Sequence, residues 1–82
     1  MKLPRDLGGA ELAALLGKYG YRQTRQTGSH LRLTSTYNKG KEHHLTIPQH
    51  KPLRIGTLSG ILNEVAAYLE MDRQYLIDSL FG

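Results

Sequence analysis

The strongest pattern in the chain is a run of apolar residues at helical spacing in its second half. The run repeats at every third or fourth position, as one face of an α-helix requires: Leu58, Ile61, Leu62, Val65, Ala66 and Leu69. A second run with the same spacing lies near the start: Leu12, Leu15, Leu16 and Tyr19. Two helices with one apolar stripe each must bury those stripes against a common surface. We expect Thr57 to cap the longer helix and Gly20 to end the shorter one.

We predict that this common surface is a sheet, because the helical spacing disappears between the two runs. Residues 30–37 alternate between apolar and polar side chains, which is typical of a half-buried strand. Residues 21–27 and 41–47 are two further predicted strands, and glycine-containing turns at residues 28–29 and 38–40 separate the three. The third strand should end at the proline in position 48, since proline cannot donate to a strand ladder.

The predicted order is therefore α-β-β-β-α, followed by a short C-terminal helix over residues 72–80. Asp72 should cap this last helix, which should bury some of Tyr75, Leu76 and Leu80. We predict an α+β fold, a two-layer sandwich like a double-stranded RNA-binding domain. In this fold both longer helices cover one face of a three-stranded antiparallel sheet. A length of 82 residues allows a single domain, residues 1–82.

The composition limits the kinds of site that the chain can contain and the compartments in which we expect it. The chain has no cysteine, so neither disulfides nor thiolate metal sites can hold it together. No apolar run is long enough to span a membrane, and the first six residues contain no apolar signal-peptide core. We therefore expect a cytoplasmic protein with no membrane partner.

Strand alternation predicts which side chains point away from the helices. Leu31 and Leu33 are the apolar pair of the second strand, so His30 and Arg32 should face solvent. By the same rule Leu45 and Ile47 point inward on the third strand, while His44 points outward and His43 shares the inner side. His30, Arg32 and His44 should then lie on one open surface, although the sequence does not reveal the register between the strands.

Basic residues are concentrated in the middle of the chain. Between positions 18 and 54 there are eight lysines and arginines and one acid, and all four histidines also lie there. Such a segment favours a polyanionic partner, because cations that neutralise phosphates release condensed counterions. The alternative is a charged, solvated surface that only keeps a small protein soluble.

Several short motifs in this segment resemble one known family. Arg25-Gln26-Thr27-Gly28-Ser29-His30 is similar to the Arg-Gln-x-Gly-Ser-His signature of the HicA toxins of bacterial toxin–antitoxin pairs. Ile47-Pro48-Gln49-His50, followed by Gly56-Thr57-Leu58 and Ile61-Leu62, resembles a second block of that family. The helix-then-Gly-aromatic pattern at the start of the chain matches as well: Leu12, Leu15-Leu16 and Gly20-Tyr21. The resemblance covers roughly residues 3 to 66.

This resemblance implies a double-stranded RNA-binding-like fold, ribonuclease activity on mRNA and inhibition by a HicB-type antitoxin. It assigns the catalytic role to His30. The chain departs from the family pattern in two places: a polar hairpin tip over residues 37–40 and a tail, residues 70–82, beyond the usual end. Both departures bear on substrate preference and oligomeric contacts.

A histidine can cut RNA without a metal, because the 2′-hydroxyl of RNA supplies the nucleophile. A neutral imidazole at His30 would take the proton from this hydroxyl as general base. Guanidinium or ammonium groups would hold the charge that develops on the phosphate. The leaving 5′-oxygen needs a proton from a second group, for which the geometry suggests His44, the motif suggests His50, and water is a third source.

We predict RNA contacts at the polar and cationic residues around His30: Arg22, Arg25, Ser29, Arg32, Lys41, Lys51 and Arg54. No metal and no small-molecule cofactor is expected, because the sequence has no H-E-x-x-H motif and the adjacent residues His43 and His44 point to opposite faces of a strand. Two other functions stay open: a non-catalytic RNA-binding module, and a protein-interaction module with a basic docking face.

Overall fold

The computed structural model describes residues 3–82, and its element order is the one that the sequence predicts. The helices and strands follow one another along the chain as α1 (Gly9–Leu16), the 3-10 turn η1 (Gly17–Tyr19), β1 (Arg22–Thr27), β2 (His30–Ser35), β3 (His43–Pro48), α2 (Ile55–Leu69) and α3 (Arg73–Phe81). The fold is α+β, with a three-stranded antiparallel sheet in the order β1-β2-β3.

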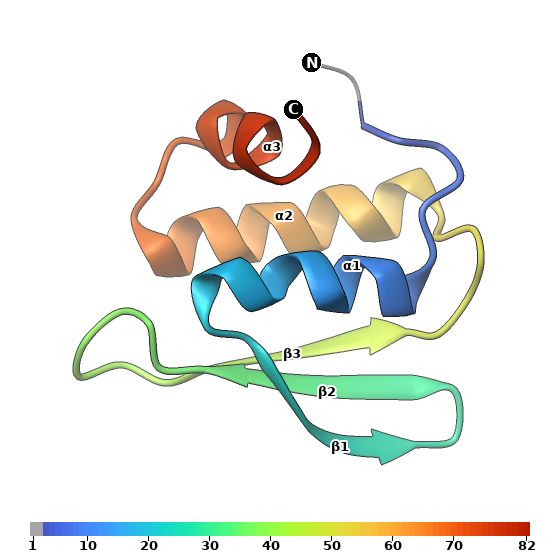
Figure 1. Ribbon diagram of the computed structural model, residues 1–82, viewed down its shortest axis with the longest axis horizontal. Helices are drawn as coiled ribbons and strands as arrows, with labels where there is room; N and C mark the ends of the chain where they lie inside the picture. Colours follow the sequence, from blue (N-terminus) through green and yellow to red (C-terminus); the bar gives the residue numbers. More distant parts are fainter. Residues whose placement is uncertain (1–2) are drawn as a thin grey trace.

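The elements are arranged in layers (Figure 1). α1 and α2 lie on the same side of the sheet, and α3 lies beyond α2, on the side away from the strands. The other face of the sheet carries no element of the described chain. We call this face, away from the helices, the outer face. The expected sandwich of helices on one sheet surface is confirmed.

The core fills the space between the sheet and the helices, as the apolar periodicity predicts. Leu31 and Leu33 from β2 and Leu45 and Ile47 from β3 are buried. Leu33, Leu45 and Ile47 belong to one cluster with buried side chains of the helices: Leu12, Leu16, Leu58, Ile61, Leu62, Val65 and Ala66. Strand alternation thus assigns the inner positions correctly, since successive side chains of a strand point to opposite faces.

The last helix closes the core from the outside. The Asp72 carboxylate accepts a hydrogen bond from the Tyr75 backbone N–H at 3.1 Å, which confirms the predicted cap. Leu76 and Leu80 are buried as expected, together with Ile77. Of the three residues from which the buried ones were expected, Tyr75 stays outside the core, with its side chain 63% exposed.

The start of α2 also differs from the sequence-based expectation. The helix begins at Ile55, two residues before Thr57, and Arg54 takes the N-cap position without a side-chain hydrogen bond. The Leu58 N–H already donates to the Arg54 carbonyl at 2.9 Å, so the first turn closes ahead of the threonine. A cap preference contributes only about 1 kcal/mol, which is too little to fix the residue at which the helix begins.

Strand ends shift by one or two residues relative to the predictions. β2 ends at Ser35, and β3 runs from His43 to Pro48 rather than from 41 to 47. Pro48 is tolerated at the end of β3 because this is an edge strand of the sheet, where one side needs no ladder bond. Gly20 ends the first helical segment in the left-handed conformation, with φ +79°, as expected.

Candidate functional site

The outer face is organised in three rows of residues that lie opposite one another across the strands. The first row contains Thr27, His30 and Pro48, the second Arg25, Arg32 and Thr46, and the third Arg22, Thr34 and His44. Each row is two residues, or about 7 Å, from the next along β2. Because β1 and β2 are one hairpin, the signature motif at residues 25–30 places its histidine and its arginine in neighbouring rows.

His30 is the first residue of β2, directly after a tight turn. Gly28 in this turn has φ +55°, a left-handed backbone conformation that favours glycine. The Gln49 N–H donates to the Ser29 carbonyl, which attaches the turn to the segment after β3. The His30 side chain is exposed on the outer face, as strand alternation predicts.

Arg25 and Arg32 lie directly opposite each other in the second row, and both are exposed. Like charges in this arrangement repel and destabilise a strand pair. The ion pairs among residues 3–82 are Lys41–Glu70, His44–Glu42 and Lys51–Glu11, and neither arginine takes part in one. The two guanidinium groups share a shallow depression of about 460 Å³ with Glu42 and His44, whose side chains pair with each other. They form a positive centre in the row next to His30, which lies outside the depression.

A β-bulge at Thr24 creates this arginine pair. The register between β1 and β2 shifts between Gln23 and Arg25. The Thr24 hydroxyl also reaches the outer face, where it is 3.1 Å from the hydroxyl of Thr34. An extra residue in one strand of a pair redirects the side chains that follow it, and here it brings Arg25 to the same face as Arg32.

His44 is on the outer face but lies far from His30. It is opposite Thr34, four residues along β2 from His30, which corresponds to about 13 Å. Both of its ring nitrogens have partners: Nδ1 is 2.9 Å from the Thr34 hydroxyl, and Nε2 is 3.1 Å from the Glu42 carboxylate. The register therefore does not bring the two histidines together.

His50 lies closer to the His30 end of the sheet. It is exposed, two residues beyond Pro48, and its carbonyl accepts a hydrogen bond from the Gly9 N–H at 3.0 Å. This bond fixes the backbone of the segment after β3 to the start of α1, while the imidazole stays accessible to solvent.

The other predicted RNA contacts divide between the two ends of the molecule. Ser29 lies in the turn next to His30, and Arg22 lies on the outer face in the third row. Lys51 and Arg54 follow His50, where the Lys51 ammonium is 3.2 Å from the Glu11 carboxylate. Lys41 is at the opposite end of the sheet and is paired with Glu70 at 3.6 Å. Both ion pairs are exposed and each contributes little to stability.

His43 faces the helices, as predicted, and is built into an aromatic cluster. Its Nδ1 is 2.7 Å from the Tyr21 hydroxyl, and its ring stacks on Tyr68 with the centroids 4.8 Å apart. Burial lowers the pKa of the His43 imidazole, and the negative charge of Glu64 opposes this shift only in part. Burial also raises the pKa of the Tyr21 hydroxyl. Both shifts favour a hydrogen bond between a neutral phenol and a neutral imidazole.

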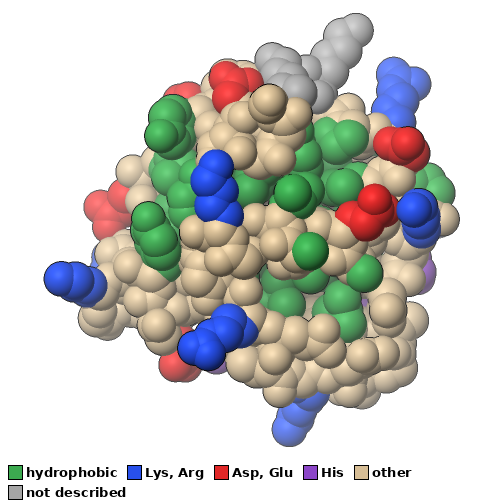
Figure 2. Space-filling model, viewed as in Figure 1, with side chains coloured by type: hydrophobic (Ala, Val, Ile, Leu, Met, Phe, Trp, Pro, Cys, Tyr) green, Lys and Arg blue, Asp and Glu red, His purple; other side chains and the backbone are tan. Residues whose placement is uncertain are grey.

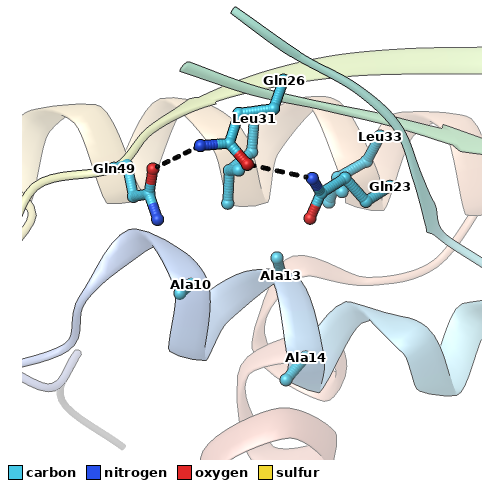
Figure 3. Close-up of a pocket in the computed structure, with 8 residues that line it drawn as sticks. All are labelled: Ala10, Ala13, Ala14, Gln23, Gln26, Leu31, Leu33 and Gln49. Carbon is cyan, nitrogen blue, oxygen red and sulfur yellow. Dashed lines mark hydrogen bonds between the residues drawn. The ribbon is translucent and has the colours of Figure 1, made fainter. Parts of the chain in front are cut away.

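The helix-facing side of β1 holds polar residues that the sequence-based interpretation missed. Gln23 and Gln26, together with Gln49, line a groove between β1 and α1 (Figure 3). In the view of Figure 2, hydrophobic side chains show through between α1 and the strands. The sequence does contain two glutamines three residues apart. Regular alternation would place them on opposite faces of β1, and only the bulge lets both point toward the helices.

Comparison with known proteins identifies the family once this geometry is in place. Residues 9–66, more than half of the chain, match the family model described as HicA toxin of bacterial toxin-antitoxin. The chain belongs to the HicA toxin family. Neither the curated proteins nor the solved structures contain a match to it.

The HicA match includes the sheet, α1 and most of α2, and therefore His30, Arg32 and His50. It ends before α3, in agreement with the prediction that the tail extends beyond the usual family pattern. Membership supports a toxin role and implies pairing with an antitoxin. No helix among residues 3–82 is long and apolar enough to cross a membrane, and the same residues contain no cluster of three side chains able to hold a metal ion.

Proposed function

We propose that this HicA chain is a cytoplasmic endoribonuclease that cleaves mRNA without a metal, with His30 as its catalytic residue. The observation that carries the proposal is the exposed arginine pair, Arg25 and Arg32, in the row next to His30. Two opposed guanidinium groups that form no ion pair among residues 3–82 favour a phosphate, which bidentate hydrogen bonds would hold.

In the proposed reaction the neutral imidazole of His30 takes the proton from a ribose 2′-hydroxyl. The 2′-oxygen then forms a bond to phosphorus, and negative charge builds up on the phosphate oxygens, where Arg32 and Arg25 would hold it. The bond from phosphorus to the 5′-oxygen breaks, and that oxygen takes a proton from His50 or from water. The products are a 2′,3′-cyclic phosphate and a 5′-hydroxyl end.

A HicB-type antitoxin would inhibit the toxin by covering the outer face, because a protein bound there excludes the RNA strand from His30. The remaining predicted contacts would help to bind the substrate. Ser29 and Arg22 would contact the strand directly, and Lys51 and Arg54 would attract it through their charge. Lys41 would act only at the far end of the sheet.

The test is incubation of the purified chain with single-stranded RNA in excess chelator, followed by mapping of the ends. We expect 2′,3′-cyclic phosphate and 5′-hydroxyl ends from the wild type, and loss of about 100-fold or more of the rate in His30→Ala. Gln74→Ala on α3 is the control, since within residues 3–82 its side chain bonds only to Asp78 on the same helix.

Three results decide between the functions. Unchanged cleavage by the folded His30→Ala variant would remove His30 from the mechanism. Salt-sensitive RNA binding without cleavage by the wild type would favour the non-catalytic module. Growth arrest on expression, relieved by His30→Ala and by co-expression of a HicB-type antitoxin, would support the toxin function.

A further inference from the structure

The groove between α1 and β1 is lined by glutamines on one side, although apolar side chains would be enough to pack the strand against the helix. It has a volume of about 310 Å³. Gln23, Gln26 and Gln49 form its upper wall in the view of Figure 3, and three alanines of α1 form the opposite side. Leu31 and Leu33 of β2 form the apolar floor. No charged side chain among the described residues lines it.

The three glutamine side chains form a chain of hydrogen bonds along the groove. The Gln23 amide Nε2 donates to Gln26 Oε1 at 3.4 Å, and Gln26 Nε2 donates to Gln49 Oε1 at 3.3 Å. The two end groups, Gln49 Nε2 and Gln23 Oε1, point toward α1 rather than toward the other glutamines (Figure 3). The groove therefore presents a donor at one end and an acceptor at the other.

These features match one chemical group, a nucleobase. A base has apolar faces that can lie against Leu31 and the alanine methyl groups, and a polar edge that needs donors and acceptors in one plane. Glutamine amides read such edges in protein–nucleic acid complexes. A phosphate would require cations, and the wall of the groove holds only neutral amides.

The groove also begins next to the proposed cleavage site. Gln26 is opposite Leu31, one residue from the row that contains His30, but on the other face of the sheet. β1 is the edge strand, so a chain that passes from the outer face to the groove has to go around one strand only, about 5 Å wide. The turn between β1 and β2 leaves room for a ligand, because a Cβ placed at Gly28 would meet no atom within 4 Å.

We propose that one base next to the scissile phosphate passes around the turn at Gly28 and enters the groove, where Gln23, Gln26 and Gln49 determine which base is accepted. This inference rests on the proposed ribonuclease function and adds the part of the protein that selects the RNA sequence. The strand itself lies on the outer face, and the groove takes a single unpaired base.

The test is cleavage of a randomised single-stranded RNA by the wild type and by three groove variants. Gln26→Met and Gln49→Met remove hydrogen bonds at similar volume, and Ala13→Leu fills the space. Gln74→Met and Ala67→Leu are the matched controls on exposed positions of α3 and α2. Thermal unfolding of each variant shows that it is folded.

We expect the wild type to prefer one base at a fixed position beside the cut. The groove variants should lose about tenfold in kcat/KM for that base and little for the others, while the controls keep the wild-type profile. A wild-type profile without base preference, or one that persists in all three variants, would overturn the groove inference and leave His30 in place.

A separate readout distinguishes failure of the groove from failure of the nuclease. If the wild type does not cleave, binding of fluorescent homopolymer RNAs by the same variants replaces cleavage as the measurement. Loss of discrimination between homopolymers in the groove variants would support the base site, and unchanged discrimination would overturn it. Weakened antitoxin binding by Ala13→Leu, with the base profile unchanged, would instead identify the groove as a protein-docking site and refute the inference.

Discussion

Two histidines on neighbouring strands, His30 and His43, have opposite environments at the two ends of the sheet. His43 faces the helices, with Tyr21 on its Nδ1 and Tyr68 stacked on its ring. His30 faces solvent, in the row next to two arginines that lack acidic partners among residues 3–82. We call the first the closed end of the sheet and the second the open end.

The difference between the two ends shows that a polar side chain is available for a ligand where it lacks a partner within the protein. At the closed end Tyr21, His43 and Tyr68 bond to one another or to the nearby backbone. The Tyr68 hydroxyl accepts a bond from the Asn38 N–H at 3.0 Å and donates to the Lys41 carbonyl at 2.8 Å, which fixes the loop between β2 and β3. At the open end the charges repel one another, and an anion would relieve that repulsion.

After the loss expected for His30→Ala, the largest effect concerns the second proton-transfer group. The register places His50 two residues beyond the partner of His30 and His44 four residues before it. We expect His50→Ala to lower the cleavage rate at least about tenfold, and His44→Ala to lower it much less. Single-turnover rates of the two variants measure this, and the reverse order would mean that the open end does not contain the whole reaction.

The next effect tests the arginine pair. Arg25→Ala and Arg32→Ala should each weaken RNA binding and lower the slope of log K against log salt by about one unit. Because each change also removes a like-charge contact, the stability of the free protein should stay the same or increase slightly. Binding titrations at four salt concentrations and thermal unfolding measure the two effects, with the exposed Arg5→Ala as the charge control. A destabilised variant would indicate that the pair has a structural role.

A smaller effect should appear at the closed end and affect stability alone. Tyr68→Phe removes one hydroxyl and leaves the Asn38 N–H and the Lys41 carbonyl without it. We expect a loss of about 1–3 kcal/mol in the free energy of unfolding, with RNA cleavage unchanged. Urea denaturation measures the loss, and a clear drop in activity at full folding would contradict the separation of the two ends.

The smallest expected effect is a pH dependence that arises from His43. Its pKa is lowered in the folded protein, so the unfolded chain binds the proton more readily. Stability should therefore fall as the pH drops through the ordinary histidine value of about 6.5, and level off below the folded value. The pKa values of Glu11 and Glu70 are also lowered, but their contribution is lost only as the pH falls further, through the carboxylate range.

His43→Phe should remove the first of these pH effects and keep the second. Melting temperatures at pH 7.5 and 5.5, at constant ionic strength, give the comparison. An equal decrease in wild type and variant would show that His43 does not contribute and that another group titrates in this range.

The local patterns of the sequence were sufficient for most of the fold. Apolar spacing identified both long helices, and alternation in β2 and β3 placed Leu31 and Leu33 inside and His30 and Arg32 outside. These predictions succeed because the spacing of apolar residues in a helix or a strand depends only on residues close together in the sequence. The start of α2 was missed because the cap signal of a single threonine is weak, about 1 kcal/mol, and does not fix where a helix begins.

The relations between strands were decided only by the tertiary structure. The sequence determined that His30 and His44 share the outer face, but the register determined that they lie about 13 Å apart. The bulge at Thr24 brought Arg25 opposite Arg32 and turned Gln23 and Gln26 toward α1. Register and bulges depend on contacts between residues that are distant in sequence, so a one-dimensional pattern cannot specify them.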